Sequence, residues 1–506
     1  MSFESAAYSR LLPRRIRKLR WSEGRWEVVA LPACVVVALV VFAHGLGASS
    51  LFVDEAASWH AAAGSLGQVF SRVRLDEVAP DTYYVFLHEW IYRFHDASEV
   101  WMRLPSMVAG VALVGAVAWL AYLVSGRLAA CIAALAAAFD PAILNYAQEV
   151  RAYVFAMLAV TVGVAAVLAA ERVKSAGALE SAGAGRRRVR WFALGLAAAV
   201  AGYSLHYTAG LVLLPLTVYV VRSRALSRRL RIVWTVGVSL TALAWLPLLL
   251  MQLGSGHNGW LGSTERHWGA DLGQTFGVAL AGRAPETPTR LLIGAAIVCA
   301  GVGIAVLRSR SAATRLVAAC ALTPPVALLV VTLGGQPVLL NRYAAIGVPF
   351  MIVALAVAAV SVRTVLRGTV AGLLVLAWLG LAGLGVRASY ETIGHYADMR
   401  AVVRDVRARI APGDVLDGVG DDAILFSLDY YAARLLPPGT LVVLASDPRV
   451  QAALRARRTI WTVTPPLSSR QLEAGLAAQR YVILADRTFP AMQTLELFET
   501  GPKPAP

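Results

Sequence analysis

The chain has 506 residues, of which 58% are hydrophobic and only 15% are charged. A mean hydropathy of +0.62 excludes an ordinary soluble globular protein and is typical of a chain that crosses a membrane several times. The net charge of +16 does not indicate a nucleic-acid partner, because the basic residues stand in short clusters between apolar runs. We therefore expect a polytopic α-helical membrane protein.

Apolar runs recur from residue 28 to residue 386. A membrane-spanning helix needs roughly 20 mostly apolar residues, and about eleven runs approach that length, the third and fifth being short. The first run lacks a small-residue cleavage site, which argues against a removable signal peptide. The runs cover 28–47, 104–124, 128–141, 153–170, 191–204, 206–221, 232–251, 291–307, 316–333, 343–362 and 368–386.

Basic clusters orient these spans. "RRIRKLR" precedes the first run, and "GRRRVR", "RSRALSRRLR", "RSRSAATR" and "RTVLR" separate later ones. With eleven spans and a cytoplasmic N-terminus (1–27), every one of these clusters lies in the cytoplasm, as the positive-inside rule expects. The sequence thus predicts a multi-pass cell-membrane protein whose membrane module covers 28–387, with its first outer loop (48–103) outside the cytoplasm.

Two helical patterns occupy the first outer loop. One runs from Asp54, as its N-cap, to about Phe70, and the other runs from Pro80 to about His95. The second, "PDTYYVFLHEWIYRFH", places aromatic and aliphatic residues on one face. An amphipathic helix of this kind lies along a membrane surface, so we expect two juxtamembrane helices here.

The part after the last span is less apolar. Residues 388–500 alternate helical patterns with four strand patterns, "DVLDGV", "TLVVLA", "TIWTVT" and "RYVILAD", which predicts an extracytoplasmic α/β domain. It contains no nucleotide-binding glycine loop. Residues 501–506, "GPKPAP", read as a tail. The four cysteines show no CxxC spacing, so neither a disulfide framework nor a zinc site is predicted.

Adjacent acids follow the first span directly. Asp54 and Glu55 have a purely structural interpretation, since Asp is a favoured N-cap and Glu in the first turn suits the helix dipole. A carboxylate beside lipid is costly, however, unless it has a function. A carboxylate in this position can act as a general base toward an acceptor hydroxyl.

Further polar residues fall in later outer loops. "NYAQEVRAYVF" contains Glu149 and Arg151, "YSLHYTAG" contains His206 and Tyr207, and "NRYAAIGVPF" contains Arg342 and Tyr343. Each pair can be an interfacial anchor, but an arginine can also bind two oxygens of a lipid phosphate. Carboxylates and arginines on one outer face would suit an enzyme that acts on a lipid-linked phosphate.

As a set, the motifs resemble the bacterial branch of the GT-C glycosyltransferases, similar to the protein O-mannosyltransferases and the lipid A aminoarabinose transferase. The resemblance covers residues 28–360 and rests on "FVDEAASWHAA", "PDTYYVFLHEWIYRF", "EVWMRLPSMVAG", "YAQEVRAYVFAML", "HYTAGLVLLPL" and "NRYAAIGVPF", in that order. It implies a polyprenyl-phosphate sugar as donor and a glycan, lipid or protein as acceptor. Mannose and arabinose are the first sugars to consider.

The resemblance also implies residue roles. Asp54 would be the catalytic base, with Glu55 assisting it, and a single displacement would invert the anomeric centre. No cofactor is required, although some relatives use a divalent metal, and Mg²⁺ or Mn²⁺ would then lie near Asp54. The donor phosphate would be held by Arg151, Arg342, His206 and Tyr207, and the substrate cavity would be lined by His60, Tyr83, Tyr84, His88, Glu149 and Tyr343.

One departure from the family concerns the stretch before the tyrosines. Relatives commonly carry His-Pro-Pro there, where this chain has "APDTYY", with Asp81 and Thr82 in place of Pro-Leu. If that histidine shapes the acceptor site, the acceptor of this chain differs.

Two other functions remain open from the sequence. A transporter or flippase of a lipid-linked or anionic substrate would place charges in the middle of its spans, where few are found here. A scaffold protein would suit the large outer domain but would leave the acids and arginines of the outer loops without a role.

Overall fold

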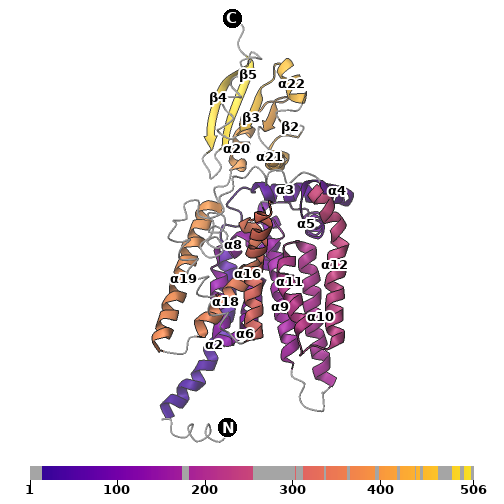
Figure 1. The fold of residues 1–506 in the computed structure, drawn as a ribbon. Helices are drawn as coiled ribbons and strands as arrows, with labels where there is room; N and C mark the ends of the chain where they lie inside the picture. Colours follow the sequence, from indigo (N-terminus) through magenta and orange to yellow (C-terminus); the bar gives the residue numbers. More distant parts are fainter. Residues whose placement is uncertain are drawn as a thin grey trace.

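The protein is described by a computed structural model in which three layers follow one another (Figure 1). A bundle of long helices forms the first layer, three short helices lie across one end of it, and a C-terminal sheet stands beyond these. The structure describes residues 14–173, 182–254, 303, 311–335, 338–361, 365–393, 398–418, 422–438, 440–444, 448–464, 481–489 and 495–502.

Long apolar helices make up the bundle, which confirms a mainly helical, multi-pass membrane protein. In the described part of the chain, five helices are long and apolar enough to cross a membrane, or six when a bent pair counts as one. The predicted span 291–307 lies outside the described residues except for Gly303, so the total of eleven stays a prediction. The bundle helices are α2 (Arg14–Ala43), α6 (Glu99–Ser125), α7 (Arg127–Ala138), α8 (Pro141–Ala147), α9 (Tyr153–Arg172), α10 (Ala182–Leu205), α11 (Ala209–Arg222), α12 (Arg228–Gly254), α16 (Ala312–Leu333), α17 (Asn341–Ala344), η1 (Ala345–Gly347), α18 (Val348–Val360) and α19 (Val365–Ile393).

The bent pair is α7 and α8, whose axes differ by 58°. Asp140 starts the second helix, because its carboxylate accepts the backbone N–H groups of Ala142 and Ile143 at 3.0 and 2.9 Å, with Pro141 in the first turn. Just after α8, the side-chain amide of Gln148 donates to the carbonyls of Phe42 and His44. The bend therefore delivers the loop before α9 to the end of α2.

The first outer loop contains three short helices, where the sequence analysis expected two. They are α3 (Val53–Ala62), α4 (Leu66–Asp76) and α5 (Thr82–Phe94). The predicted helix from Asp54 to Phe70 breaks at Gly64, whose φ is +87°, and Ser65 starts α4 with a capping box that includes Gln68.

The predicted N-cap was also wrong. Phe52 is the N-cap of α3, and the Glu55 carboxylate accepts its backbone N–H at 2.8 Å. Asp54 is therefore not used in capping, and its carboxylate is directed elsewhere.

A five-stranded mixed sheet forms the third layer, in the order β2-β1-β3-β5-β4. β1 pairs in parallel with β2 and β3, with Val415 opposite Leu441 and Ile460, while β5 is antiparallel to β3 and β4. β5 matches no predicted strand and ends two residues inside the predicted tail. The elements are α20 (Met399–Arg407), β1 (Val415–Gly418), α21 (Asp422–Leu435), β2 (Leu441–Leu444), α22 (Pro448–Arg455), β3 (Ile460–Thr464), β4 (Tyr481–Phe489) and β5 (Leu495–Pro502).

The outer helices and the C-terminal part share one hydrophobic core. Tyr83 and Leu87 of α5 belong to the same buried cluster as Met399 of α20, Tyr430 of α21 and Trp461 of β3. Burying apolar area contributes about 25 cal/mol per Å², so this common core holds the layers together. α3 is consequently fixed between the bundle and the C-terminal part.

We predict that Gly110→Ala destabilises the protein. A Cβ at Gly110 in α6 would come within 2.6 Å of the Ala147 Cβ in α8, and overpacking of this kind costs about 1–3 kcal/mol. The apparent melting temperature of the purified protein in detergent should fall. The control is Gly115→Ala in the same helix, where no atom lies within 4 Å of the added Cβ. Equal melting temperatures for both variants would contradict a tight α6–α8 contact.

Candidate functional site

Asp54 meets two arginines at the outer end of the bundle. The Asp54 Oδ2 atom lies 2.7 Å from Arg342 Nη1 and 3.9 Å from Arg151 Nη2. The three side chains come from α3, from α17 and from the loop between α8 and α9. They stay partly open, with 27% of the Asp54 side chain, 20% of Arg342 and 13% of Arg151 exposed. A ligand can therefore reach both cations and the carboxylate.

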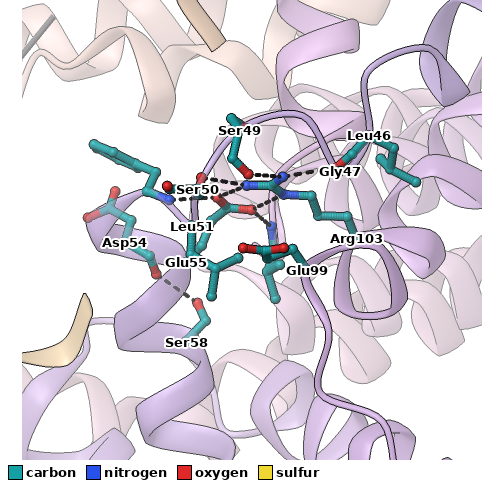
Figure 2. Close-up of polar contacts among 12 residues, drawn as sticks. Leu46, Gly47, Ser49, Ser50, Leu51, Asp54, Glu55, Ser58, Glu99 and Arg103 are labelled. Carbon is teal, nitrogen blue, oxygen red and sulfur yellow. Dashed lines mark hydrogen bonds and ion pairs between the residues drawn. The ribbon is translucent and has the colours of Figure 1, made fainter. Parts of the chain in front are cut away.

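Glu55, next to Asp54, is buried against Arg103 of α6 (Figure 2). Two N–H groups of the Arg103 guanidinium donate to the two Glu55 carboxylate oxygens at 2.8 and 2.7 Å. Glu55 Oε1 also accepts the backbone N–H of Val150, and Oε2 accepts that of Phe52. Each oxygen thus has two donors, and Glu55 fixes both the start of α3 and the residue before Arg151.

The other Arg103 donors face the chain that links α2 to α3. They bond to the carbonyls of Leu46, Ser49 and Ser50 at 2.9–3.2 Å. The contacts of all three guanidinium nitrogens stabilise this buried cation. Figure 2 shows Arg103 between this segment and Glu55, with Asp54 turned away from the pair. The segment that carries Asp54 is therefore anchored to α6.

Arg151 is held by a second buried group. Its Nη1 donates to Glu77 Oε1 at 2.9 Å and to the Ser58 hydroxyl at 3.1 Å, and it lies 3.4 Å from the Tyr84 hydroxyl. Burial alone would lower the pKa of Arg151, but Glu77, Tyr84 and Asp54 carry that pKa well above its ordinary value. Burial, with Glu77 adding to it, raises the pKa of Tyr84. Arg151 therefore stays charged and Tyr84 neutral.

His206 lies beside the arginines as a neutral ring. It packs on Tyr153 and Tyr343 with ring centroids 4.7 and 6.3 Å away, and the Arg342 guanidinium stands 5.5 Å over the Tyr343 ring. Burial, helped by Arg151 and Arg342, lowers the pKa of His206 to about 3. Its Nδ1 accepts the N–H of Thr208, so the neutral ring carries its proton on Nε2.

Several of the expected residues contact other parts of the molecule. His60 stacks on Phe426 of α21, His88 bonds to the Ala62 carbonyl, and the Tyr207 hydroxyl donates to Gln252 of α12. Tyr83 is buried among aromatic rings of α5 and α9. Glu149 is half-buried in the loop of Arg151. The first four of these side chains thus pack against partners that lie away from the Asp54 carboxylate.

Two important residues were not singled out from the sequence. Glu77 ends α4 and carries no motif that marks it as the partner of Arg151. Arg103 lies in a quoted motif, "EVWMRLPSMVAG", and its presence four residues into an otherwise apolar helix was a usable signal, because a cation so placed needs an acidic partner.

The surroundings of Asp54 do not suit a divalent cation. In the residues that the structure describes, no group of three or more His, Cys, Asp or Glu side chains can hold a metal ion. The groups nearest to the Asp54 carboxylate are guanidinium cations, which repel another cation. These residues therefore do not fit the Mg²⁺ or Mn²⁺ ion that the sequence resemblance allowed there.

Comparison with known proteins gives a fold but no sequence family. No protein-family model and no curated protein matches the chain. Its structure is similar to ArnT from Cupriavidus metallidurans in the apo state, with a TM-score of 0.58 and 14% identity over 94% of this chain and 98% of that one. ArnT bound to undecaprenyl phosphate gives a TM-score of 0.54.

A second similar structure is the archaeal oligosaccharyltransferase AglB from Archaeoglobus fulgidus, in complex with an inhibitory peptide and a dolichol-phosphate. Its TM-score is 0.52 and its identity 12%, over 94% of this chain and 74% of that one. ArnT and AglB are GT-C glycosyltransferases. The resemblance to that group is therefore confirmed at the level of the fold.

We predict that Glu55→Ala strongly destabilises the protein. The variant leaves the Arg103 cation buried without its partner, which costs about 3–5 kcal/mol. The fraction of protein that remains monomeric on size exclusion after heating should fall sharply. The control is Glu89→Ala at an exposed position of α5, which should behave as the wild type. A Glu55→Ala variant as heat-resistant as this control would refute the anchoring role of Glu55.

His206 predicts a pH dependence of stability. Its folded-state pKa of about 3 lies below the ordinary value of 6.5, so below pH 6.5 only the unfolded chain binds the proton. Its contribution to stability is therefore complete above pH 6.5 and is lost as the pH falls toward 3. Between about pH 7 and pH 4.5, the melting temperature should fall less for His206→Gln than for the wild type. His95→Asn, at an exposed position, should retain the wild-type dependence, and an unchanged slope in His206→Gln would disprove the assignment.

Proposed function

We propose that this protein is a membrane glycosyltransferase that moves a sugar from a polyprenyl-phosphate donor to an acceptor hydroxyl on the extracytoplasmic face. The observation that carries the proposal is the contact of the Asp54 carboxylate with Arg342 and Arg151, which brings a base next to two phosphate-binding groups. The fold supports it, since similar structures hold undecaprenyl phosphate and dolichol-phosphate.

The two guanidinium groups are the donor-phosphate ligands in this proposal. Arginine offers paired N–H groups that match phosphate oxygens, and both side chains are partly exposed on the side of Asp54. Arg342 has to exchange its bond to Asp54 for one to phosphate, whereas Glu77 keeps Arg151 in place from behind. The Nε2–H of His206 is a third, uncharged donor beside these arginines.

The reaction is a single displacement at the anomeric carbon. The acceptor oxygen forms the new bond to that carbon, the bond from the carbon to the phosphate oxygen breaks, and Asp54 takes the acceptor proton. Polyprenyl phosphate leaves with the electron pair and is stabilised by the arginines. One base opposite one leaving group favours inversion. Retention would need a carboxylate nucleophile, and the neighbouring acid, Glu55, has both oxygens bonded to four donors.

Glu55 is thus a positioning residue in this mechanism, while Asp54 moves the proton. The two acids are adjacent in sequence but face different surroundings, one bonded to α6 and the other directed to the arginines. The buried Glu55 sets where Asp54 lies without contacting substrate.

The membrane orientation is part of the proposal. The site lies at the end of the bundle that faces the C-terminal sheet, whereas the described start of α2, within the basic N-terminal segment, lies at the opposite end (Figure 1). The positive-inside rule then puts the start of α2 in the cytoplasm and the site outside it. Mannose and arabinose remain the sugars to test first.

We predict that Asp54→Asn abolishes most of the transfer. Removing a general base lowers kcat by about 10²–10⁴-fold, while the KM for the donor should not rise because both arginines remain. The assay uses purified protein in proteoliposomes with radiolabelled polyprenyl-phosphate mannose and arabinose, and it counts label in the acceptor fraction. The matched control is Glu89→Gln, which removes an exposed acid of α5.

Two results would reject the proposal. Wild-type turnover by Asp54→Asn would remove Asp54 as the base. Movement of labelled donor across the proteoliposome membrane, with its sugar–phosphate bond intact and no label transferred, would assign the protein as a transporter instead.

A further inference from the structure

The N-terminal end of α3 is held by the C-terminal part of the chain as well as by the bundle. On the bundle side, Arg103 of α6 bonds to this segment. From the opposite direction, the backbone N–H of Leu51 donates to the Tyr431 hydroxyl of α21 at 2.6 Å. That hydroxyl donates in turn to Glu99 at the start of α6, also at 2.6 Å. One phenol therefore joins α21, α6 and the residue before the N-cap of α3.

Two residues around the start of α20 reinforce this contact. The Ser50 hydroxyl donates to Asp398 at 2.7 Å. Arg400 donates to the carbonyls of Gly47 and Ser49 at 3.3 and 2.5 Å, and it forms a 3.0 Å ion pair with Glu99. The backbone from residue 47 to residue 51 is thus bonded to α20 and α21 at successive positions.

Side-chain packing continues the contact along α3. Trp59 lies edge-on to Tyr430 with ring centroids 5.1 Å apart, and His60 stacks on Phe426 at 4.5 Å. His60 was expected in the substrate cavity, so its place in this interface accounts for it. α3 is consequently held at its start by hydrogen bonds and along its length by aromatic rings of α21.

We propose that the C-terminal domain positions the catalytic base, with Tyr431 and Arg400 as the positioning residues. This inference rests on the proposed transfer reaction. Leu51 is three residues before Asp54, so a shift of the segment moves the Asp54 carboxylate relative to the arginines. Arg151 and Arg342 come from other elements and do not move with it. Loss of this hold should impair proton removal and leave donor binding intact.

The test compares two adjacent tyrosines. Tyr431→Phe removes the hydroxyl that bonds to Leu51 and Glu99. Tyr430→Phe removes a hydroxyl that donates to the Ala97 carbonyl in the loop after α5, and it keeps the ring that packs on Trp59. Both substitutions delete one buried phenol oxygen and preserve the aromatic core, so they are matched in size and chemistry.

For Tyr431→Phe we expect kcat to fall about ten- to a hundredfold, since a misplacement of about 1 Å costs on that order, with the donor KM unchanged within twofold. Tyr430→Phe should keep kcat within twofold of the wild type at the same melting temperature. Arg400→Gln is the second variant and should repeat the signature of Tyr431→Phe, so the test does not depend on one protein folding.

Three results would overturn the inference. Wild-type kcat in both Tyr431→Phe and Arg400→Gln would show that the contacts do not position Asp54. Equal losses of activity and melting temperature in Tyr431→Phe and Tyr430→Phe would show a purely structural role. No transfer by the wild-type protein would reject the proposed function, and the inference with it, so the two failures are distinguishable.

Discussion

The buried ion pair between Glu55 and Arg103 is the constraint on which the rest of the site depends. It joins the end of α2, the start of α3, the start of α6 and the loop before α9 through hydrogen bonds of 2.7–3.2 Å. A buried charge is tolerated only when its partners are complete, and here both carboxylate oxygens and all three guanidinium nitrogens have partners. Because the residues next to Glu55 and Val150 are Asp54 and Arg151, this structural pair sets the geometry of two residues that it does not touch.

The charges around Asp54 have a different character, because they stay accessible. Arg342 forms the close ion pair with Asp54, and Arg151 lies farther off with Glu77 as its main partner. In the proposed reaction, Arg342 serves first as the counterion of the base and then as a ligand of the donor phosphate. Arrival of the phosphate would therefore free the Asp54 carboxylate at the moment when it is needed. One exchange of partners thereby links donor binding to proton removal.

Sequence reasoning reached the fold class and the residues that meet, since both follow from local signals. Apolar runs gave the helices, and acids and arginines beside them gave Asp54, Arg151 and Arg342. The break of the first outer helix had a local signal that was overlooked, because Gly64 and the Ser65–Gln68 pair are a helix stop followed by a capping box. The alternating "LELFET" of β5 was a similar missed signal.

Other features had no local signal. The partnership of Arg151 with Glu77, the burial of Glu55 and the contact of Tyr431 with Leu51 depend on elements far apart in the sequence. Propensity and hydrophobic period describe single elements and carry no information on which side chains will meet across them. The mistaken N-cap at Asp54 has the same origin, because only the three-dimensional surroundings show that Glu55 makes the capping bond.

The contacts between the outer loop and the C-terminal domain also have a bearing on biogenesis. Ser50 and Asp398 are separated by 348 positions, and Leu51 and Tyr431 by 380. At a synthesis rate of about 5–20 residues per second, the ribosome needs roughly 20–75 s to make the second partner after the first. The start of α3 must wait in the membrane through that interval with only its bundle contacts made. A nascent chain therefore completes this geometry only near the end of translation, so unfinished copies in the envelope would lack the final brace on Asp54.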